Sequence, residues 1–132
     1  MRIGKIPDDL QLLKTITKEK YMRQAINFLR CFRNPRTSGK LQLFIEENVC
    51  WFAVCFNKTT IRIMGIAVAE EKRSLGIGTQ IVNKIKNMAQ AKNLEGITLR
   101  ADPAGRQFIF WLRQGFKVTR ELEDDVEMKW TL

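Results

Sequence analysis

Phosphate binding is the chemistry indicated by six consecutive residues, Arg73-Ser74-Leu75-Gly76-Ile77-Gly78. They lie between an apolar, partly β-branched run at 61–69, typical of a buried strand, and a segment with apolar residues every three or four positions, typical of an amphipathic helix. A strand that turns through glycines into a helix leaves the first helical N–H groups unpaired and directed outward. These groups attract phosphate, and glycine allows a ligand close to the backbone. Arg73 adds positive charge, although this loop alone leaves open the alternative of a plain tight turn.

The spacing of this loop matches neither of the common nucleotide-binding fingerprints. The pattern G-x-x-x-x-G-K-[ST] is absent, and G-x-G-x-x-G fails at its last position, which is Ile81. The loop instead resembles the acetyl-coenzyme A loop of the GNAT superfamily of N-acetyltransferases, R/Q-x-x-G-x-G/A. Arg73, Gly76 and Gly78 occupy its three fixed positions.

A second match lies downstream, in the same order as in that family. Asp102-Pro103 is typical of a helix start, with Asp as N-cap and Pro at the first helical position. Gly115 stands where a left-handed C-cap residue belongs. The stretch 110–116 resembles the family's closing helix, which ends in an aromatic residue, three residues and Gly-Phe. Three side chains share one face of this predicted helix: Phe108, Trp111 and Leu112.

The resemblance implies an acetyltransferase that uses acetyl-CoA as co-substrate, needs no metal, and passes the acetyl group directly to an amine. The amine would belong to a small molecule or a protein that the sequence does not identify. Ile66 and Val68 would pair with the pantetheine arm as a neighbouring strand does, and an N–H group near Val68 would hold the thioester oxygen. The resemblance implies these cofactor-binding residues: Ile66, Ala67, Val68, Arg73, Ser74, Leu75, Gly76, Ile77, Gly78 and Thr79.

No catalytic acid or base is assigned from the sequence. Trp111 stands where the family often has a tyrosine, and an indole has no proton to give a thiolate at neutral pH. A non-catalytic CoA-binding domain is therefore one alternative. Candidate bases for the amine, acting through water, are Glu46, Glu70 and an acidic cluster near the C-terminus. This cluster, which could instead keep a sheet edge soluble, consists of Glu121, Glu123, Asp124, Asp125 and Glu127.

Positive charge is concentrated near the N-terminus. The net charge is +9, and residues 1–40 hold ten Lys and Arg against three acidic residues. A basic surface of this kind attracts nucleic acid, an acidic protein or an anionic cofactor. A solvated pair of helices is the other reading. An enzyme or accessory factor that acts on nucleic acid or its protein machinery thus remains an alternative function.

Length and composition indicate one folded domain over residues 1–132. Hydrophobic residues make up 45% of the chain, which is ordinary for a globular protein. No apolar run approaches the roughly 20 residues of a membrane span, and no signal-peptide core begins the chain. We therefore expect a cytoplasmic protein without membrane contact. The sequence does not decide between a monomer and a homodimer.

The cysteines indicate a reducing compartment. Cys50 and Cys55 are five residues apart in a predicted strand, so they lie on opposite faces and cannot bridge each other. Cys31 lies on a predicted helix. Because the chain has no histidine, a Cys/His zinc site, a Cys-His nucleophile and a Ser-His-Asp triad are all excluded.

The order of predicted elements indicates an α/β (α+β) fold. Its central sheet is mixed and mostly antiparallel, with helices on its faces, and the same arrangement is the acetyltransferase (GNAT) fold. The predicted strands lie at 2–6, 41–46, 49–57, 59–69, 96–100, 116–121 and 126–131. The first predicted helix begins at Pro7-Asp8-Asp9 and the second covers about 18–33. A third follows the glycine loop, and a fourth follows Asp102.

Overall fold

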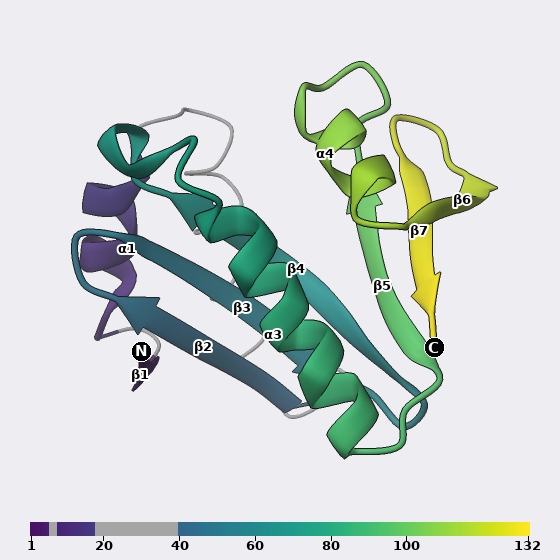
Figure 1. Ribbon diagram of the computed structural model, residues 1–132, viewed down its shortest axis with the longest axis horizontal. Helices are drawn as coiled ribbons and strands as arrows, with labels where there is room; N and C mark the ends of the chain where they lie inside the picture. The colour runs from purple at the N-terminus through teal and green to yellow at the C-terminus, as the bar shows by residue number, and fades with distance from the viewer. Residues whose placement is uncertain (6–7, 18–39) are drawn as a thin grey trace.

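The protein was analysed as a computed structural model that describes residues 1–5, 8–17 and 40–132. In these residues the chain forms a seven-stranded sheet with the order β1-β2-β3-β4-β5-β7-β6 (Figure 1). Only β4 and β5 run parallel, so the predicted mixed, mostly antiparallel sheet is confirmed. The elements are β1 (Arg2–Gly4), α1 (Leu10–Ile16), β2 (Lys40–Glu46), β3 (Cys50–Phe56), β4 (Thr60–Val68), η2 (Glu70–Lys72), α3 (Ile77–Ala91), β5 (Gly96–Ala101), α4 (Gln107–Arg113), β6 (Lys117–Glu121) and β7 (Val126–Thr131).

Helices cover both faces of the sheet, which explains why β3 is an unbroken apolar run. Alternate side chains of a strand point to opposite faces. Phe52 and Val54 belong to the core on the α3 side, whereas Trp51 and Ala53 belong to the core beneath α1. Cys50 lies on the α3 side, and Cys50 and Cys55 are not joined to each other in a disulfide.

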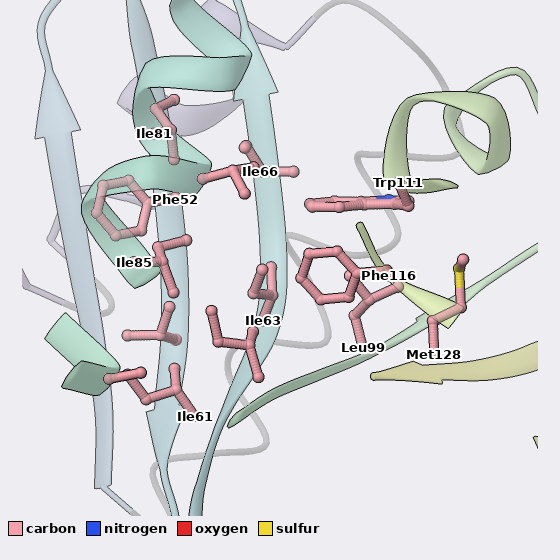
Figure 2. Packing of buried hydrophobic residues seen from close by; sticks show 14 of the residues in the cluster. Phe52, Ile61, Ile63, Ile66, Ile81, Ile85, Leu99, Trp111, Phe116 and Met128 are labelled. Atoms are coloured by element: carbon pink, nitrogen blue, oxygen red, sulfur yellow. The ribbon is translucent and has the colours of Figure 1, made fainter. Parts of the chain in front are cut away.

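The larger core lies between the sheet, α3 and α4 (Figure 2). The predicted apolar stripe of α3 is confirmed, with Ile81, Val82, Ile85 and Ala89 buried. Burying each of the isoleucine and valine side chains contributes about 1.5–3 kcal/mol. The core therefore holds α3 firmly against β3 and β4.

The strands β4 and β5 separate after a short paired stretch. Their parallel pairing ends at Arg62↔Thr98, and the two strands diverge toward the end where α4 lies (Figure 1). The register between β3 and β4 shifts at Ala53/Val54, which marks a β-bulge. Bulges bend and twist the strand that carries them. Gly65 lies at this bend, where an added Cβ would come within 2.7 Å of the Trp51 ring. The bend directs β4 away from β5 and opens the space described below.

Two predictions about α4 are wrong. The helix begins at Gln107 rather than at Pro103, because the Asp102 carboxylate accepts the Ala104 N–H at 2.9 Å and the Gly105 N–H bonds the Asp102 carbonyl at 2.9 Å. These bonds close a separate turn ahead of the helix. Leu112 is 42% exposed and does not share the buried face of Trp111.

The end of α4 is as predicted. Gly115 has φ +94°, in the left-handed region. The Phe116 N–H donates to the Trp111 carbonyl and the Gly115 N–H to the Leu112 carbonyl, both at 3.1 Å. This pair of bonds is the Schellman motif. It turns the chain sharply and buries Phe116 behind the helix.

Several predictions fall on residues that the structure does not describe. They are the helix at about 18–33, the position of Cys31 and most of the basic residues of 1–40. No described helix is long and apolar enough to cross a membrane.

Candidate functional site

The edge of β4 that faces the open space carries backbone groups from Ile66 and Val68. The Ala69 N–H donates at 2.7 Å to the carbonyl of Val49, the residue just before β3, so Ala69 faces the β3 edge. Because the hydrogen-bonding direction alternates along an antiparallel strand, Ile66 and Val68 direct their N–H and C=O groups to the other edge. The pairing with β5 has already ended at Arg62. An extended ligand can therefore add to β4 there as another strand does.

Arg73 is held against the end of this edge. Its Nε donates to the Val68 carbonyl at 3.3 Å. This contact ties the loop that precedes α3 to the last residue of β4. Part of the hydrogen-bonding capacity of the guanidinium is thus used within the chain, and its positive charge stays beside the loop.

The loop enters α3 through residues with left-handed backbone. Ser74 has φ +69° and Gly76, the N-cap residue, has φ +77°. No side chain caps the helix, and its first turn holds no acidic residue. The first intrahelical bond runs from Gln80 N–H to the Gly76 carbonyl at 3.0 Å. The N–H groups of Ile77, Gly78 and Thr79 precede that bond, and they form an anion-binding helix N-terminus.

A cavity of about 340 Å³ lies against this helix end and the β4 edge. All the cofactor-binding residues predicted from the sequence line it except Leu75, whose side chain is 64% exposed. An added Cβ at Gly78 would lie 3.3 Å from the Phe110 ring, so even a methyl group there crowds the wall. The lining also includes Trp111, which stands where the family often has a tyrosine, and residues that the sequence did not indicate: Thr17, Lys72, Gln107 and Phe110.

A second cavity of about 560 Å³ lies deeper in the space between β4 and β5. The two cavities share Ile66, Gln107 and Trp111, so they meet at the middle of the opening. The larger cavity is apolar along β4 and polar near α4. Its charged lining residues are Arg100, Asp102 and Arg106.

Among the described residues that line the two cavities, Asp102 is the only one with a carboxylate. The bases considered from the sequence, Glu46, Glu70 and the acidic cluster, do not line either cavity. Asp125 pairs with Arg100 at 3.2 Å, and Glu127 pairs with Arg120 at 3.4 Å. Asp102 directly follows β5, and this position could have indicated a site residue at the end of a strand. The sequence pattern around Asp102 predicts only a helix cap.

Trp111 forms the wall where the cavities meet. It projects from α4 toward Ile66 on β4 (Figure 2) and is 3% exposed. Its ring makes edge contacts with Phe110 at 5.0 Å and Phe116 at 5.2 Å between centroids. These contacts hold the indole rigidly beside the opening.

On the other face of the sheet, Thr17 follows α1 and meets Trp51. The Trp51 Nε1 donates to the Thr17 Oγ1 at 2.8 Å, and both side chains are buried. Thr17 also lines the smaller cavity. The cavity thus reaches from the N-terminus of α3 past β4 to the α1 side of the sheet.

The cysteines in the described part of the chain, Cys50 and Cys55, do not offer a nucleophile. Burial, with a smaller contribution from the Glu46 charge, raises the pKa of the Cys50 thiol to about 11. Burial also raises the pKa of Cys55. Both are protonated at neutral pH, and a thiol reacts only as thiolate. Among residues 1–5, 8–17 and 40–132, no three His, Cys, Asp or Glu side chains cluster as metal ligands.

Comparison with solved structures finds the same fold in acetyltransferases. The ribosomal-protein-S18-alanine N-acetyltransferase from Escherichia coli matches with a TM-score of 0.74 and 12% identity, over 98% of this chain and 92% of that chain. The PaiA N-acetyltransferase from Thermoplasma acidophilum, solved with coenzyme A, matches with a TM-score of 0.71 and 12% identity, over 99% and 98%. A GNAT family acetyltransferase from Elizabethkingia anophelis with acetyl-CoA bound matches with a TM-score of 0.65 and 21% identity, over 99% and 97%.

Sequence comparisons give one family. Among curated proteins, no sequence matches this chain significantly. The profile of the acetyltransferase (GNAT) family matches residues 10–116.

Proposed function

Because this chain belongs to the acetyltransferase (GNAT) family, we propose that it transfers an acetyl group from acetyl-CoA directly to an amine. One observation carries the proposal: a single cavity joins the uncapped N-terminus of α3 to the open edge of β4. A phosphate-bearing ligand with an extended, amide-containing arm needs both features side by side.

The residues present fit coenzyme A. The N–H groups at the start of α3 would hold the phosphates, with Lys72 and Arg73 adding positive charge beside them. Ile66 and Val68 would bond the amides of the pantetheine arm along the β4 edge. The thioester would then lie between Val68 and Trp111, beside the residues that the two cavities share.

The larger cavity would hold the acceptor amine. For attack on the thioester carbon, the amine must first lose a proton, and we assign Asp102 as the base, acting directly or through one water. The Val68 N–H would donate to the carbonyl oxygen as negative charge develops on it. The new C–N bond forms, the C–S bond breaks, and the electron pair leaves with sulfur.

Trp111 does not protonate the leaving group, because indole nitrogen is a donor without usable acidity. A thiol has an ordinary pKa of about 8.5, so the thiolate of CoA can leave into water with little assistance. Attack of the amine on the thioester carbon, coupled to removal of its proton, then limits the rate.

A second candidate is a CoA-binding domain without catalysis, which the indole at position 111 favours. The alternative of a nucleic-acid-directed factor rests on the basic residues of 1–40, most of which lie outside the described part. A cytoplasmic location is proposed because the two cysteines of β3 are not joined in a disulfide.

Release of CoA thiol from acetyl-CoA separates the catalytic from the non-catalytic candidate. The assay uses a panel of amines: small amino acids, polyamines, aromatic amines and peptides with free N-termini. We expect at least one amine to raise release well above hydrolysis without enzyme. Cofactor binding with no release for any amine would favour the CoA-binding domain. Binding to duplex and single-stranded nucleic acid across a salt series tests the remaining alternative, since phosphate contacts weaken steeply with salt.

A further inference from the structure

Thr17 is a buried hydroxyl in the wall of the cofactor cavity. Thr17 is 2% exposed, and it is the only buried polar residue in the described part of the chain. It lines the cavity together with Ile66, Ala67 and Val68. A buried polar group in a cavity wall needs a hydrogen-bonding partner.

The orientation of this hydroxyl follows from its one described side-chain partner. Indole Nε1–H is a donor only, so the contact at 2.8 Å makes the Thr17 Oγ1 an acceptor from Trp51. The hydroxyl proton must therefore point elsewhere. No described residue accepts it, while the Thr17 backbone N–H is already bonded to the Leu13 carbonyl at 3.0 Å. Within the described residues, the hydroxyl proton is thus available to a ligand in the cavity.

The donor lies on the side of β4 opposite the phosphate site. Trp51 pairs with Ala67 in the sheet and faces α1, whereas α3 packs on the other face. A ligand that runs from the helix N-terminus along β4 passes the part of the cavity wall that Thr17 shares with Ile66, Ala67 and Val68. In the proposed complex the acetyl thioester lies at this part of the wall.

We propose that the Thr17 hydroxyl donates a hydrogen bond to the carbonyl oxygen of the acetyl group, as a second donor beside the Val68 N–H. The proposal rests on the proposed binding of acetyl-CoA in this cavity. Two preorganised donors on one carbonyl oxygen stabilise the charge that develops there. Trp51 is then a positioning residue, because it fixes which way the hydroxyl of Thr17 turns.

The test compares two ligands that differ at the carbonyl. Acetyl-CoA has the oxygen, and S-ethyl-coenzyme A has a methylene in its place. Calorimetry gives the dissociation constants of both for the unmodified protein and for Thr17→Val, Thr17→Ser and Thr15→Val. Thr15→Val is the matched control on α1, because the Thr15 hydroxyl is exposed and donates to the Gln11 carbonyl at 3.0 Å.

We expect Thr17→Val to reduce the preference for acetyl-CoA over S-ethyl-coenzyme A by roughly fivefold to tenfold, as loss of one hydrogen bond does. Thr17→Ser should restore the preference, and Thr15→Val should leave it unchanged. With an accepted amine, Thr17→Val should lower kcat by at least about tenfold with a smaller change in the KM for acetyl-CoA. If Thr17→Val does not fold, Thr17→Ala removes the same hydroxyl and carries the comparison.

Two negative outcomes are distinguishable. If both ligands bind and Thr17→Val keeps the full preference for acetyl-CoA, the hydroxyl only satisfies Trp51 and the proposal for Thr17 is overturned. If neither ligand binds the unmodified protein, the proposed function fails and this proposal fails with it.

Discussion

The ammonium group of Lys86 on α3 donates to the backbone carbonyl of Gln114 at the end of α4, at 2.6 Å. Gln114 also reaches back, since its Nε2 donates to the Thr79 Oγ1 in the first turn of α3 at 3.1 Å. Lys86 lies over the Trp130 ring, 4.9 Å from its centroid. These contacts fix α4 against α3 and so set the distance between Trp111 and the opposite wall of the cavity.

Replacing Lys86 by Met should lower the free energy of unfolding by about 2 kcal/mol. The charge-assisted bond to a partly buried carbonyl contributes about 1.5–3 kcal/mol, and the contact with Trp130 about 0.5–1 kcal/mol. Denaturant unfolding measures the change. Lys84→Met, an exposed lysine on the same helix, is the matched control and should shift stability by less than about 0.5 kcal/mol. Equal losses in the two variants would mean that the bond to Gln114 contributes nothing specific.

Asp102→Asn should lower kcat by about a hundredfold or more and leave the KM for acetyl-CoA nearly unchanged. Asparagine cannot take a proton from the amine, and general bases contribute about 10²–10⁴ in rate. Its side-chain oxygen can still accept the Ala104 N–H, so the turn ahead of α4 should persist. Steady-state kinetics with the best amine of the panel makes the measurement. Glu127→Gln serves as control, and Asp102 is not the base if both variants keep full kcat.

Trp111→Phe should retain most of the activity of the folded enzyme. The indole is a wall and core residue in this structure, and phenylalanine keeps an aromatic ring in contact with Phe110 and Phe116. Some stability should be lost, since a smaller ring leaves space in a buried site. A collapse of kcat with acetyl-CoA affinity intact would reveal a chemical role for the indole N–H.

The stability of the protein should depend on Cys50 at alkaline pH. Folding raises the pKa of the Cys50 thiol from 9.0 to about 11, so the folded state binds the proton more tightly than the unfolded state. This contribution is complete below pH 9 and is lost as the pH rises from about 9 to about 11. We expect the unfolding free energy of the parent protein to fall in this window more steeply than that of Cys50→Ala. Parallel curves for the two proteins would show that the thiol is not perturbed.

The elements around the glycine loop could be predicted from the sequence because their signals are local. The period of Ile81 and Ile85 sets the buried face of α3, and Gly76 supplies the left-handed entry to it. The Schellman ending at Gly115 is equally local. These signals survive because the tertiary structure does not compete with them.

The rest of the site depends on contacts between distant segments. Asp102 looks like a helix cap in the sequence, but its carboxylate closes a turn, and it lines a cavity only because β4 bends away from β5. Thr17 has no signal at all. Its burial comes from a contact with Trp51, 34 residues away, which no periodicity reveals.

The central claim is that coenzyme A binds with its phosphates on the first turn of α3. Calorimetric titration of acetyl-CoA into the unmodified protein, Gly78→Glu and Gln80→Glu tests it most directly. Gly78→Glu adds a side chain whose Cβ would lie 3.3 Å from the Phe110 ring, and a negative charge where phosphate should lie. Gln80→Glu adds the same charge on the exposed face of the helix. We predict one molar equivalent bound, a loss of about a hundredfold, or about 2.7 kcal/mol, for Gly78→Glu, and nearly normal affinity for Gln80→Glu. Unchanged affinity in a folded Gly78→Glu protein would contradict the claim.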